Sequence, residues 1–350
     1  MKNNTTQKSS YYIVLALHGG GALAAFQAGA YKAMEEAGYL PDWISAISMG
    51  GANAAIIAGN PLQERANKLD HFWEMLTSWG PVQKRPKNPD FHFFNFWSYM
   101  NSLVFGQRNY YSARHTNPYF SPPGSKAATS NYSIAPFKAT LEKVIDFEKL
   151  NSDAPRLTIG CTQVKKGDLI FFDNQKTTIA PRHIMTGIAF PGAFPGEIID
   201  GELYWDGGCV ANSPIDAFLD EIPDIPGGKA LVFMIDMWPT AGIEPQTMGQ
   251  LEWRALQLFY GTSGRDLRAI SNRCELHVRR TGKPLQVHVV HLKYVTSYED
   301  SFSVISPHSP LAISGSKKQG YEDMKKILEA SPWEIDGGNP ETHCHIYSYP

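Results

Sequence analysis

Two apolar stretches decide the predicted fold: residues 11–17, YYIVLAL, and residues 43–47, WISAI. Runs of this length with almost no polar residue predict strands buried on both faces, as in a parallel sheet. Each is followed by a turn of small residues, HGGG or SMGG, and then by an Ala-rich helix predicted over 22–38 or 52–58. This repeated strand–turn–helix order predicts an α/β fold, a three-layer α/β/α sandwich with a mainly parallel central sheet.

The rest of the chain extends this pattern. Further strands are expected at 156–163, 168–172, 230–237 and 286–294, and further helices near 61–79, 136–150, 182–189, 213–220, 247–275 and 310–330.

The domain organisation follows from a change in composition along the chain. Residues 81–135 are rich in Pro, Asn, Ser and aromatic residues, which predicts an insertion into a core formed by 11–240. The C-terminal region 241–335 is expected to pack on that core. Residues 1–10 and 336–350 are expected to be flexible tails.

Overall composition narrows the function classes. The 350 residues are 43% apolar and 19% charged, which is typical of a folded globular protein. The net charge of −2 argues against a nucleic-acid partner. Four widely spaced cysteines with no CxxC pair predict neither a disulfide framework nor a zinc cluster, and they favour a reducing compartment.

No segment predicts a signal peptide or a membrane span, because the apolar run at 11–17 is too short for either. A cytoplasmic or peripheral-membrane location is therefore expected. Specialised secretion would need no such signal.

The second turn carries a candidate nucleophile. Ala46-Ile47-Ser48-Met49-Gly50 matches the nucleophile elbow G-x-S-x-G, with Ala46 at the first position. The elbow needs small residues such as Ala46 and Gly50 beside the serine because strand and helix approach closely there. The alternative is that Ser48 only caps the following helix.

The first turn could supply an oxyanion hole through the free backbone amides of Gly19, Gly20 and Gly21. The alternative is a nucleotide-binding α/β protein, since Gly19-x-Gly21-x-x-Ala24 also fits the dinucleotide fingerprint. That site needs an acidic residue at the end of the second strand. Asp42 instead precedes that strand, which weakens the alternative.

The third candidate is Asp206, which follows β-like residues and precedes Gly207 and Gly208. Two glycines permit a sharp turn and a close backbone approach. Taken alone, an Asp-Gly pair most often marks a plain hairpin turn.

Together, the glycine loop, the Ala-x-Ser-x-Gly elbow and the distant Asp-Gly-Gly resemble the patatin-like phospholipase family, over about residues 11–235. The similarity is closest to a bacterial branch whose loop is Gly-Gly-Gly-Ala-Leu. That branch has a distinctive C-terminal region, which 286–330 resembles. Leu23 stands where many members have Arg, and Ala24 where Gly is usual.

The resemblance implies a serine acyl hydrolase that cleaves ester bonds of phospholipids or related lipids through an acyl-enzyme intermediate. Ser48 would be the nucleophile and Asp206 its base, and Gly19, Gly20 and Gly21 would form the oxyanion hole. No metal or other cofactor is implied. The expected partner is a lipid substrate, with peripheral membrane contact. A non-catalytic lipid-binding protein on the same fold remains an alternative.

Two further groups of residues are candidates. Aromatic side chains of the insertion, Phe94 and Trp97 among them, could line an acyl pocket or contact a lipid surface. The alternative is that these side chains are simply buried against the core. A histidine could complete a conventional triad; the conceivable residues are His18, His183, His291 and His308.

Overall fold

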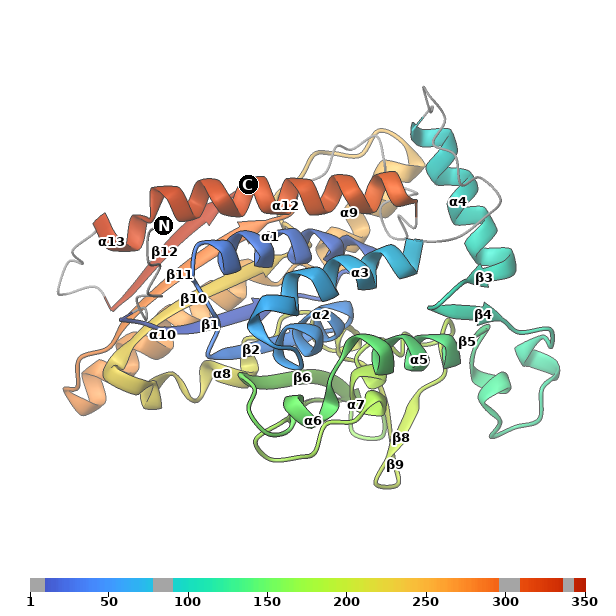
Figure 1. Ribbon diagram of the computed structural model, residues 1–350, viewed down its shortest axis with the longest axis horizontal. Coiled ribbons are helices and arrows are strands. Elements are labelled where there is room, and N and C mark those ends of the chain that lie inside the picture. The colour runs from blue at the N-terminus through green and yellow to red at the C-terminus, as the bar shows by residue number, and fades with distance from the viewer. Residues whose placement is uncertain (1–9, 78–90, 296–308, 336–342) are drawn as a thin grey trace.

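A mainly parallel sheet runs through the centre of the protein (Figure 1). The computed structural model describes residues 10–77, 91–295, 309–335 and 343–350. Nine of the described strands form this sheet: β1 (Tyr12–Leu17), β2 (Trp43–Ile47), β6 (Arg156–Gln163), β7 (Asp168–Asp173), β8 (Glu197–Ile199), β9 (Glu202–Asp206), β10 (Lys229–Asp236), β11 (Gln286–Lys293) and β12 (Cys344–Tyr349).

The order of the strands confirms the predicted sheet type. Strands β12, β11, β10, β1, β2 and β6 lie side by side in that order, and each pairs with the next in parallel. Strands β7 and β9 both pair with β6 in the antiparallel sense, and β8 pairs with β9 in the same sense. The three antiparallel strands therefore lie at one side of an otherwise parallel sheet.

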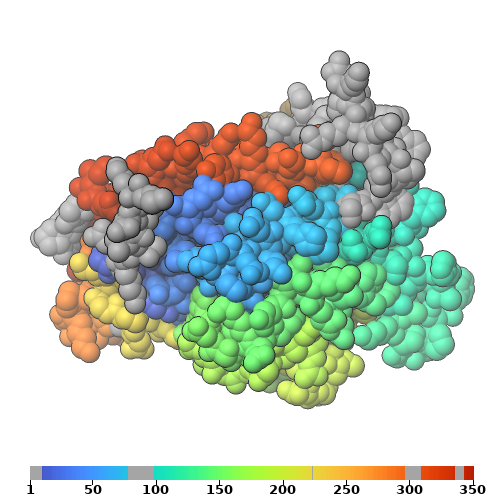
Figure 2. Space-filling model, viewed as in Figure 1, coloured from blue at the N-terminus to red at the C-terminus, as the bar shows by residue number. Residues whose placement is uncertain are grey.

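Helices cover both faces of the sheet and make it the middle of three layers. One face carries α1 (Ala25–Glu36), α2 (Met49–Ala58), α3 (Arg65–Thr77) and α12 (Pro310–Ala330), and the other carries α8 (Asp216–Leu219) and α10 (Ser263–Thr281). Figure 2, from the same side as Figure 1, shows α12, α1 and α3 packed next to one another over the first face.

The side chains of β1 show how the sequence produces these layers. Successive residues of a strand point to opposite faces. Ile13, Leu15 and Leu17 join the core with α1, α2 and α12, whereas Val14 and Ala16 join the core with α8 and α10. The uninterrupted apolar run is thus explained by burial on both faces.

The insertion adds a small separate sheet. Its described part consists of α4 (Phe91–Phe105) and three short antiparallel strands, β3 (Gly106–Gln107), β4 (Tyr111–Ala113) and β5 (Tyr132–Ser133). These elements lie at the right-hand end of the molecule in Figure 1.

Four shorter helices complete the described elements named here. They are α5 (Ala135–Val144), α6 (Phe147–Leu150), α7 (Pro181–Thr186) and α13 (Pro332–Ile335).

Three expectations need correction. The helix predicted near 136–150 is two helices, α5 and α6, because the chain becomes extended at Ile145. The helix predicted over 247–275 is two helices, α9 (Met248–Tyr260) and α10, because the chain becomes extended at Gly261. A flexible tail is predicted over 336–350, but Cys344–Tyr349 form β12, which pairs with β11 at the edge of the sheet. Among the helices of the described ranges, none has the length and apolar character needed to cross a membrane.

Candidate active site

The glycine loop and Ser48 emerge side by side at one edge of the sheet. Strands β1 and β2 are parallel neighbours, with Leu17 paired to Ala46. The turns that follow them therefore meet at the carboxyl edge, which is where parallel α/β sheets hold their ligands.

Ser48 occupies a constrained turn between β2 and α2. Its backbone has φ 56° and ψ −134°, and a positive φ is uncommon for a residue other than glycine. Its side chain makes no capping hydrogen bond to α2, although it stands at the N-cap position. The hydroxyl instead donates to Oδ2 of Asp206 at 2.7 Å. The capping role considered from the sequence therefore does not describe this serine.

Small residues at the elbow have a steric cause. A Cβ atom at Gly50 would lie 2.8 Å from the carbonyl oxygen of Leu17 and 3.1 Å from that of His18. Ala46 is completely buried in the core at the end of β2. The close approach of α2 to the end of β1 therefore leaves no room for a larger residue at position 50.

Asp206 ends strand β9 and is 5% exposed. Its Oδ2 accepts from the hydroxyl of Ser48, and its Oδ1 accepts from the amide of Gly208 at 2.8 Å. Its own amide donates to the carbonyl oxygen of Ala189 at 3.1 Å, and its carbonyl oxygen accepts from Oγ1 of Thr162 at 2.9 Å. The Asp-Gly-Gly segment is therefore a fixed junction at the sheet edge and not a plain hairpin turn.

Burial raises the pKa of the Asp206 carboxyl to about 7, against the hydrogen bonds from Ser48 and Gly208, which lower it. Removing a carboxylate from water disfavours its charged form, and hydrogen bonds donated to it favour that form. A carboxyl group with a pKa near neutrality can both accept and return a proton in neutral solution.

The glycine loop touches the serine directly. A Cβ atom at Gly19 would lie 2.9 Å from Cβ of Ser48 and 2.2 Å from Oδ1 of Asn212. Gly21 has φ 54°, in the left-handed region that favours glycine. Within the described part of the chain, the amides of Gly20 and Gly21 donate no intramolecular hydrogen bond. They are available to an oxygen atom bound beside Ser48.

Leu23 and Ala24, which depart from the family pattern, are both completely buried. They belong to the short 3-10 turn Gly21–Ala24 that joins the loop to α1. The carbonyl oxygen of Ala24 accepts a hydrogen bond from Asn53 Nδ2 at 2.8 Å. Both residues therefore act in packing behind the loop.

Sequence reasoning missed two residues that hold the loop from behind. The carbonyl oxygen of Gly19 accepts from Nδ2 of Asn212 at 2.9 Å and from Nε1 of Trp238 at 2.6 Å. Asn212 follows the Asp-Gly-Gly segment, and Trp238 follows β10. No local pattern marks either contact, because each depends on segments about 200 positions apart in the chain.

Three of the histidines considered for a triad make their contacts away from Ser48 and Asp206. His18 Nδ1 lies 3.6 Å from Oδ1 of Asp236, and His291 Nε2 lies 3.2 Å from Oδ2 of the same carboxylate. His183 Nδ1 accepts from the amide of Ala180 at 2.8 Å. In the described ranges, no histidine is hydrogen-bonded to Ser48 or Asp206. His308 lies outside the described residues.

Tyr110 of the insertion, which the sequence did not single out, is a buried residue with an electrostatic influence from Asp206. Tyr110 is 9% exposed, and its pKa is raised chiefly by burial and further by the charge of Asp206. Its ring contacts Phe194, with centroids 5.6 Å apart. Phe94 and Trp97, the predicted substrate contacts, lie in α4, but their side chains are outside what the structure describes.

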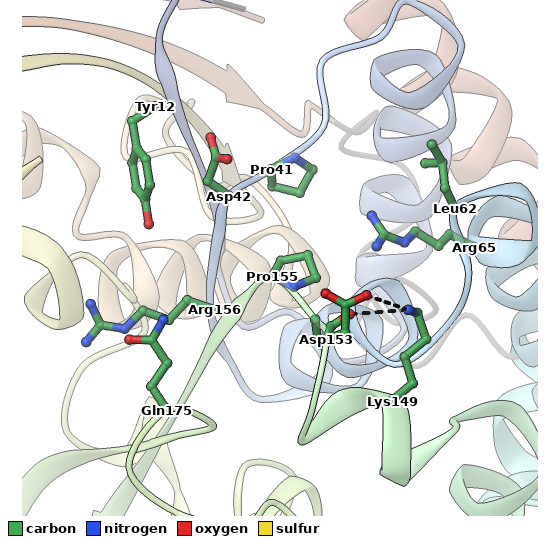
Figure 3. Close-up of a pocket in the computed structure, with 11 residues that line it drawn as sticks. Tyr12, Pro41, Asp42, Leu62, Arg65, Lys149, Asp153, Pro155, Arg156 and Gln175 are labelled. Atoms are coloured by element: carbon green, nitrogen blue, oxygen red, sulfur yellow. Dashed lines mark hydrogen bonds and ion pairs between the residues drawn. The ribbon is translucent and has the colours of Figure 1, made fainter. Parts of the chain in front are cut away.

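The opposite edge of the sheet carries a separate open cavity of about 550 Å³ (Figure 3). It is lined by residues near the starts of β1, β2 and β6, including Tyr12, Asp42 and Arg156. Two of its cationic residues are paired within the protein, Arg156 with Asp173 and Lys149 with Asp153.

This arrangement also bears on the nucleotide-binding alternative. The side chain of Asp42 accepts from the amide of Ile13 at 2.8 Å, far from the glycine loop at the other end of β1. A carboxylate placed there does not reach a ribose bound at the glycine loop.

Comparison with known proteins identifies the family of this chain. A search of curated proteins found no match. Among solved structures, VipD from Legionella pneumophila is similar at 14% identity with a TM-score of 0.41; the alignment covers 92% of this chain and 67% of that of VipD. The family model described as patatin-like phospholipase matches residues 15–219, more than half of the chain. This chain therefore belongs to the patatin-like phospholipase family, a family of lipid acyl hydrolases.

Proposed function

We propose that the protein hydrolyses ester bonds of phospholipids or related lipids, with Ser48 as nucleophile and Asp206 as general base. The observation that carries the proposal is the 2.7 Å hydrogen bond from Oγ of Ser48 to Oδ2 of a buried carboxylate. A serine hydroxyl is a weak nucleophile until an adjacent base accepts its proton. Asp206 is the base that this geometry offers.

The first half of the reaction forms an acyl-serine. Oγ attacks the ester carbonyl carbon while Asp206 takes the hydroxyl proton. The amides of Gly20 and Gly21 receive the oxyanion, and the N-terminus of α2 adds a favourable field. When the tetrahedral intermediate collapses, Asp206 returns its proton to the departing alcohol oxygen, and the C–O bond of the ester breaks.

The second half releases the acid. A water molecule enters the space vacated by the alcohol. Asp206 accepts one proton from this water, and the oxygen of the hydroxide formed attacks the acyl carbon. Collapse breaks the bond to Oγ of Ser48, which recovers the proton from Asp206. A single carboxyl group thus serves both halves, which agrees with a pKa near neutrality.

A lipid substrate is supported by apolar side chains around the dyad. Phe190 is 45% exposed and follows Ala189, whose carbonyl oxygen accepts from the amide of Asp206. Val210 is 47% exposed and lies four positions after Asp206 in the chain. Phe259 is 77% exposed and precedes Tyr260, whose ring faces Gly208. Exposed apolar residues beside a catalytic edge suit acyl chains and the surface of a membrane.

The test is hydrolysis by purified protein of phospholipid vesicles, lysophospholipid and a soluble short-chain ester. Ser48→Ala is expected to reduce kcat by at least about a thousandfold. Ser152→Ala, at an exposed position outside the site, serves as the matched control with unchanged activity. Equal hydrolysis by wild type and Ser48→Ala would overturn the assignment. Vesicle binding by wild type without turnover of any ester would favour the non-catalytic lipid-binding alternative.

A further inference from the structure

The inference concerns Trp238 and how it holds the oxyanion loop. Its indole Nε1 donates a 2.6 Å hydrogen bond to the carbonyl oxygen of Gly19. Asn212 Nδ2 donates to the same oxygen at 2.9 Å. Trp238 lies beyond residues 15–219, the part of the chain that the family model matches.

The carbonyl of Gly19 and the amide of Gly20 belong to one peptide group. A trans peptide is planar, and its C=O and N–H point in opposite directions. Fixing the oxygen on one side therefore fixes the direction of the Gly20 N–H on the other. A hydrogen bond to the oxygen also polarises the peptide and strengthens its N–H as a donor.

Trp238 is itself held firmly. Its backbone amide donates to Oδ1 of Asp236 at 2.8 Å, and its ring packs against Trp253 and Tyr260 of α9, with centroids 5.3 Å and 5.2 Å apart. The indole is 4% exposed. The position of the donor is therefore set by the protein before any substrate binds.

Asp236 can be buried completely because it is well partnered. Its second oxygen lies 3.2 Å from Nε2 of His291, and Nδ1 of His18 lies 3.6 Å from Oδ1. Burial would raise the pKa of Asp236, but the hydrogen bond with His291 and the nearby imidazoles outweigh it and hold the pKa at about 2. The carboxylate thus stays charged and keeps its hydrogen bond to the Trp238 amide.

We propose that Trp238, anchored by Asp236, is a positioning residue that aims the Gly20 amide at the oxyanion formed on the Ser48 adduct. The inference rests on the proposed serine hydrolase function. It assigns a task to a tryptophan and an aspartate–histidine group that the Ser48–Asp206 chemistry does not use.

Phenylalanine at position 238 would keep an aromatic ring and lose the N–H. Trp333→Phe is the matched control, since Trp333 is as buried as Trp238 but packs against Tyr39 and Phe233 and not against the residues that hold the glycine loop. Trp238→Phe is expected to lower kcat about 10- to 100-fold with KM within about twofold, because an oxyanion donor acts in the transition state. Trp333→Phe is expected to keep kcat within about twofold.

A second measurement separates positioning from packing. Trifluoromethyl ketones form a tetrahedral oxyanion with the active serine, so their inhibition constant should rise in Trp238→Phe by a factor similar to the fall in kcat. If Trp238→Phe does not fold, replacing Trp238 with 3-benzothienylalanine keeps the ring shape and removes only the N–H. A kcat and an inhibition constant in Trp238→Phe that equal those of Trp333→Phe would overturn the inference. Absence of any esterase activity in wild type would instead overturn the proposed function.

Discussion

Oγ of Ser48 lies 2.7 Å from Oδ2 of Asp206, although 158 positions separate the two residues in the chain. Ser48 is held there by a turn with positive φ, and Asp206 by the end of an antiparallel strand beside β6. Both constraints come from backbone geometry. The contact is therefore a property of the fold and is formed before substrate binds.

The dependence of activity on pH follows from burial of Asp206. Its pKa is raised to about 7, and only the ionised form can take the proton of Ser48. kcat/KM for a soluble ester is expected to rise with pH as Asp206 ionises, with an apparent pKa of about 7, and to level off above it. The pH dependence of kcat/KM reports the pKa values of the free enzyme, so this profile follows the ionisation of Asp206 before substrate binds. A profile that is flat from pH 5 to pH 8 would contradict this role.

The same group should make stability depend on pH. Its folded-state pKa of about 7 exceeds the ordinary value of 3.8, so between about pH 4 and pH 7 the folded protein holds a proton that the unfolded chain has released. The free energy of unfolding should therefore fall as pH rises through this window.

Asp206→Asn removes this dependence, and at pH 8 the variant should be more stable than wild type by up to about 4 kcal/mol, at about 1.4 kcal/mol per pKa unit. Urea unfolding of both proteins at pH 5 and pH 8 measures the difference. A stability gap between variant and wild type that stays the same at the two pH values would show that Asp206 is not buried in its protonated form.

Space around Gly19 gives a steric test of the loop. A methyl group there would meet Oδ1 of Asn212 and Cβ of Ser48, so Gly19→Ala should reduce kcat by at least about 100-fold by displacing the loop. Gly264→Ala is the matched control, since a Cβ atom at Gly264 would meet nothing within 4 Å. Steady-state kinetics on the soluble ester compare the two. Full activity in Gly19→Ala would mean that the loop does not need to contact Ser48.

The cavity at the opposite edge of the sheet should matter for stability and not for catalysis. Arg156 is bonded to both Asp173 and Glu221, and the side chain of Asp173 is 5% exposed. Arg156→Met leaves Asp173 without this partner and should lower the free energy of unfolding by about 3 kcal/mol. Lys138→Ala, which breaks the exposed pair with Glu142, should cost less than about 1 kcal/mol. Loss of kcat in folded Arg156→Met would instead connect this cavity with the reaction.

The layers of the fold could be predicted because their signals are local. The runs at 11–17 and 43–47 are buried on both faces of the sheet. The two turns that follow them lie next to each other at its carboxyl edge. Membership of the patatin-like family agrees with the resemblance seen in the sequence. The catalytic roles of Ser48 and Asp206 stay predictions until activity is measured.

Contacts between distant segments could not be predicted. The hydrogen bond from Trp238 to Gly19 exists because β10 pairs with β1, a pairing that joins positions more than 200 residues apart. Strand β12 was missed because its alternating residues follow a segment rich in Gly and Pro and make only an edge strand. The break at Gly261 depends on the route of the chain after α9, and helical periodicity continues across it.

The central claim is that Asp206 activates Ser48, and labelling with a fluorophosphonate probe tests it most directly. Wild type, Ser48→Ala, Asp206→Asn and Ser152→Ala would be followed over time by intact-mass spectrometry. We expect one adduct per chain in wild type and Ser152→Ala, none in Ser48→Ala, and labelling slowed by at least about 100-fold in Asp206→Asn. An adduct that persists in Ser48→Ala, or labelling of Asp206→Asn at the wild-type rate, would contradict the account.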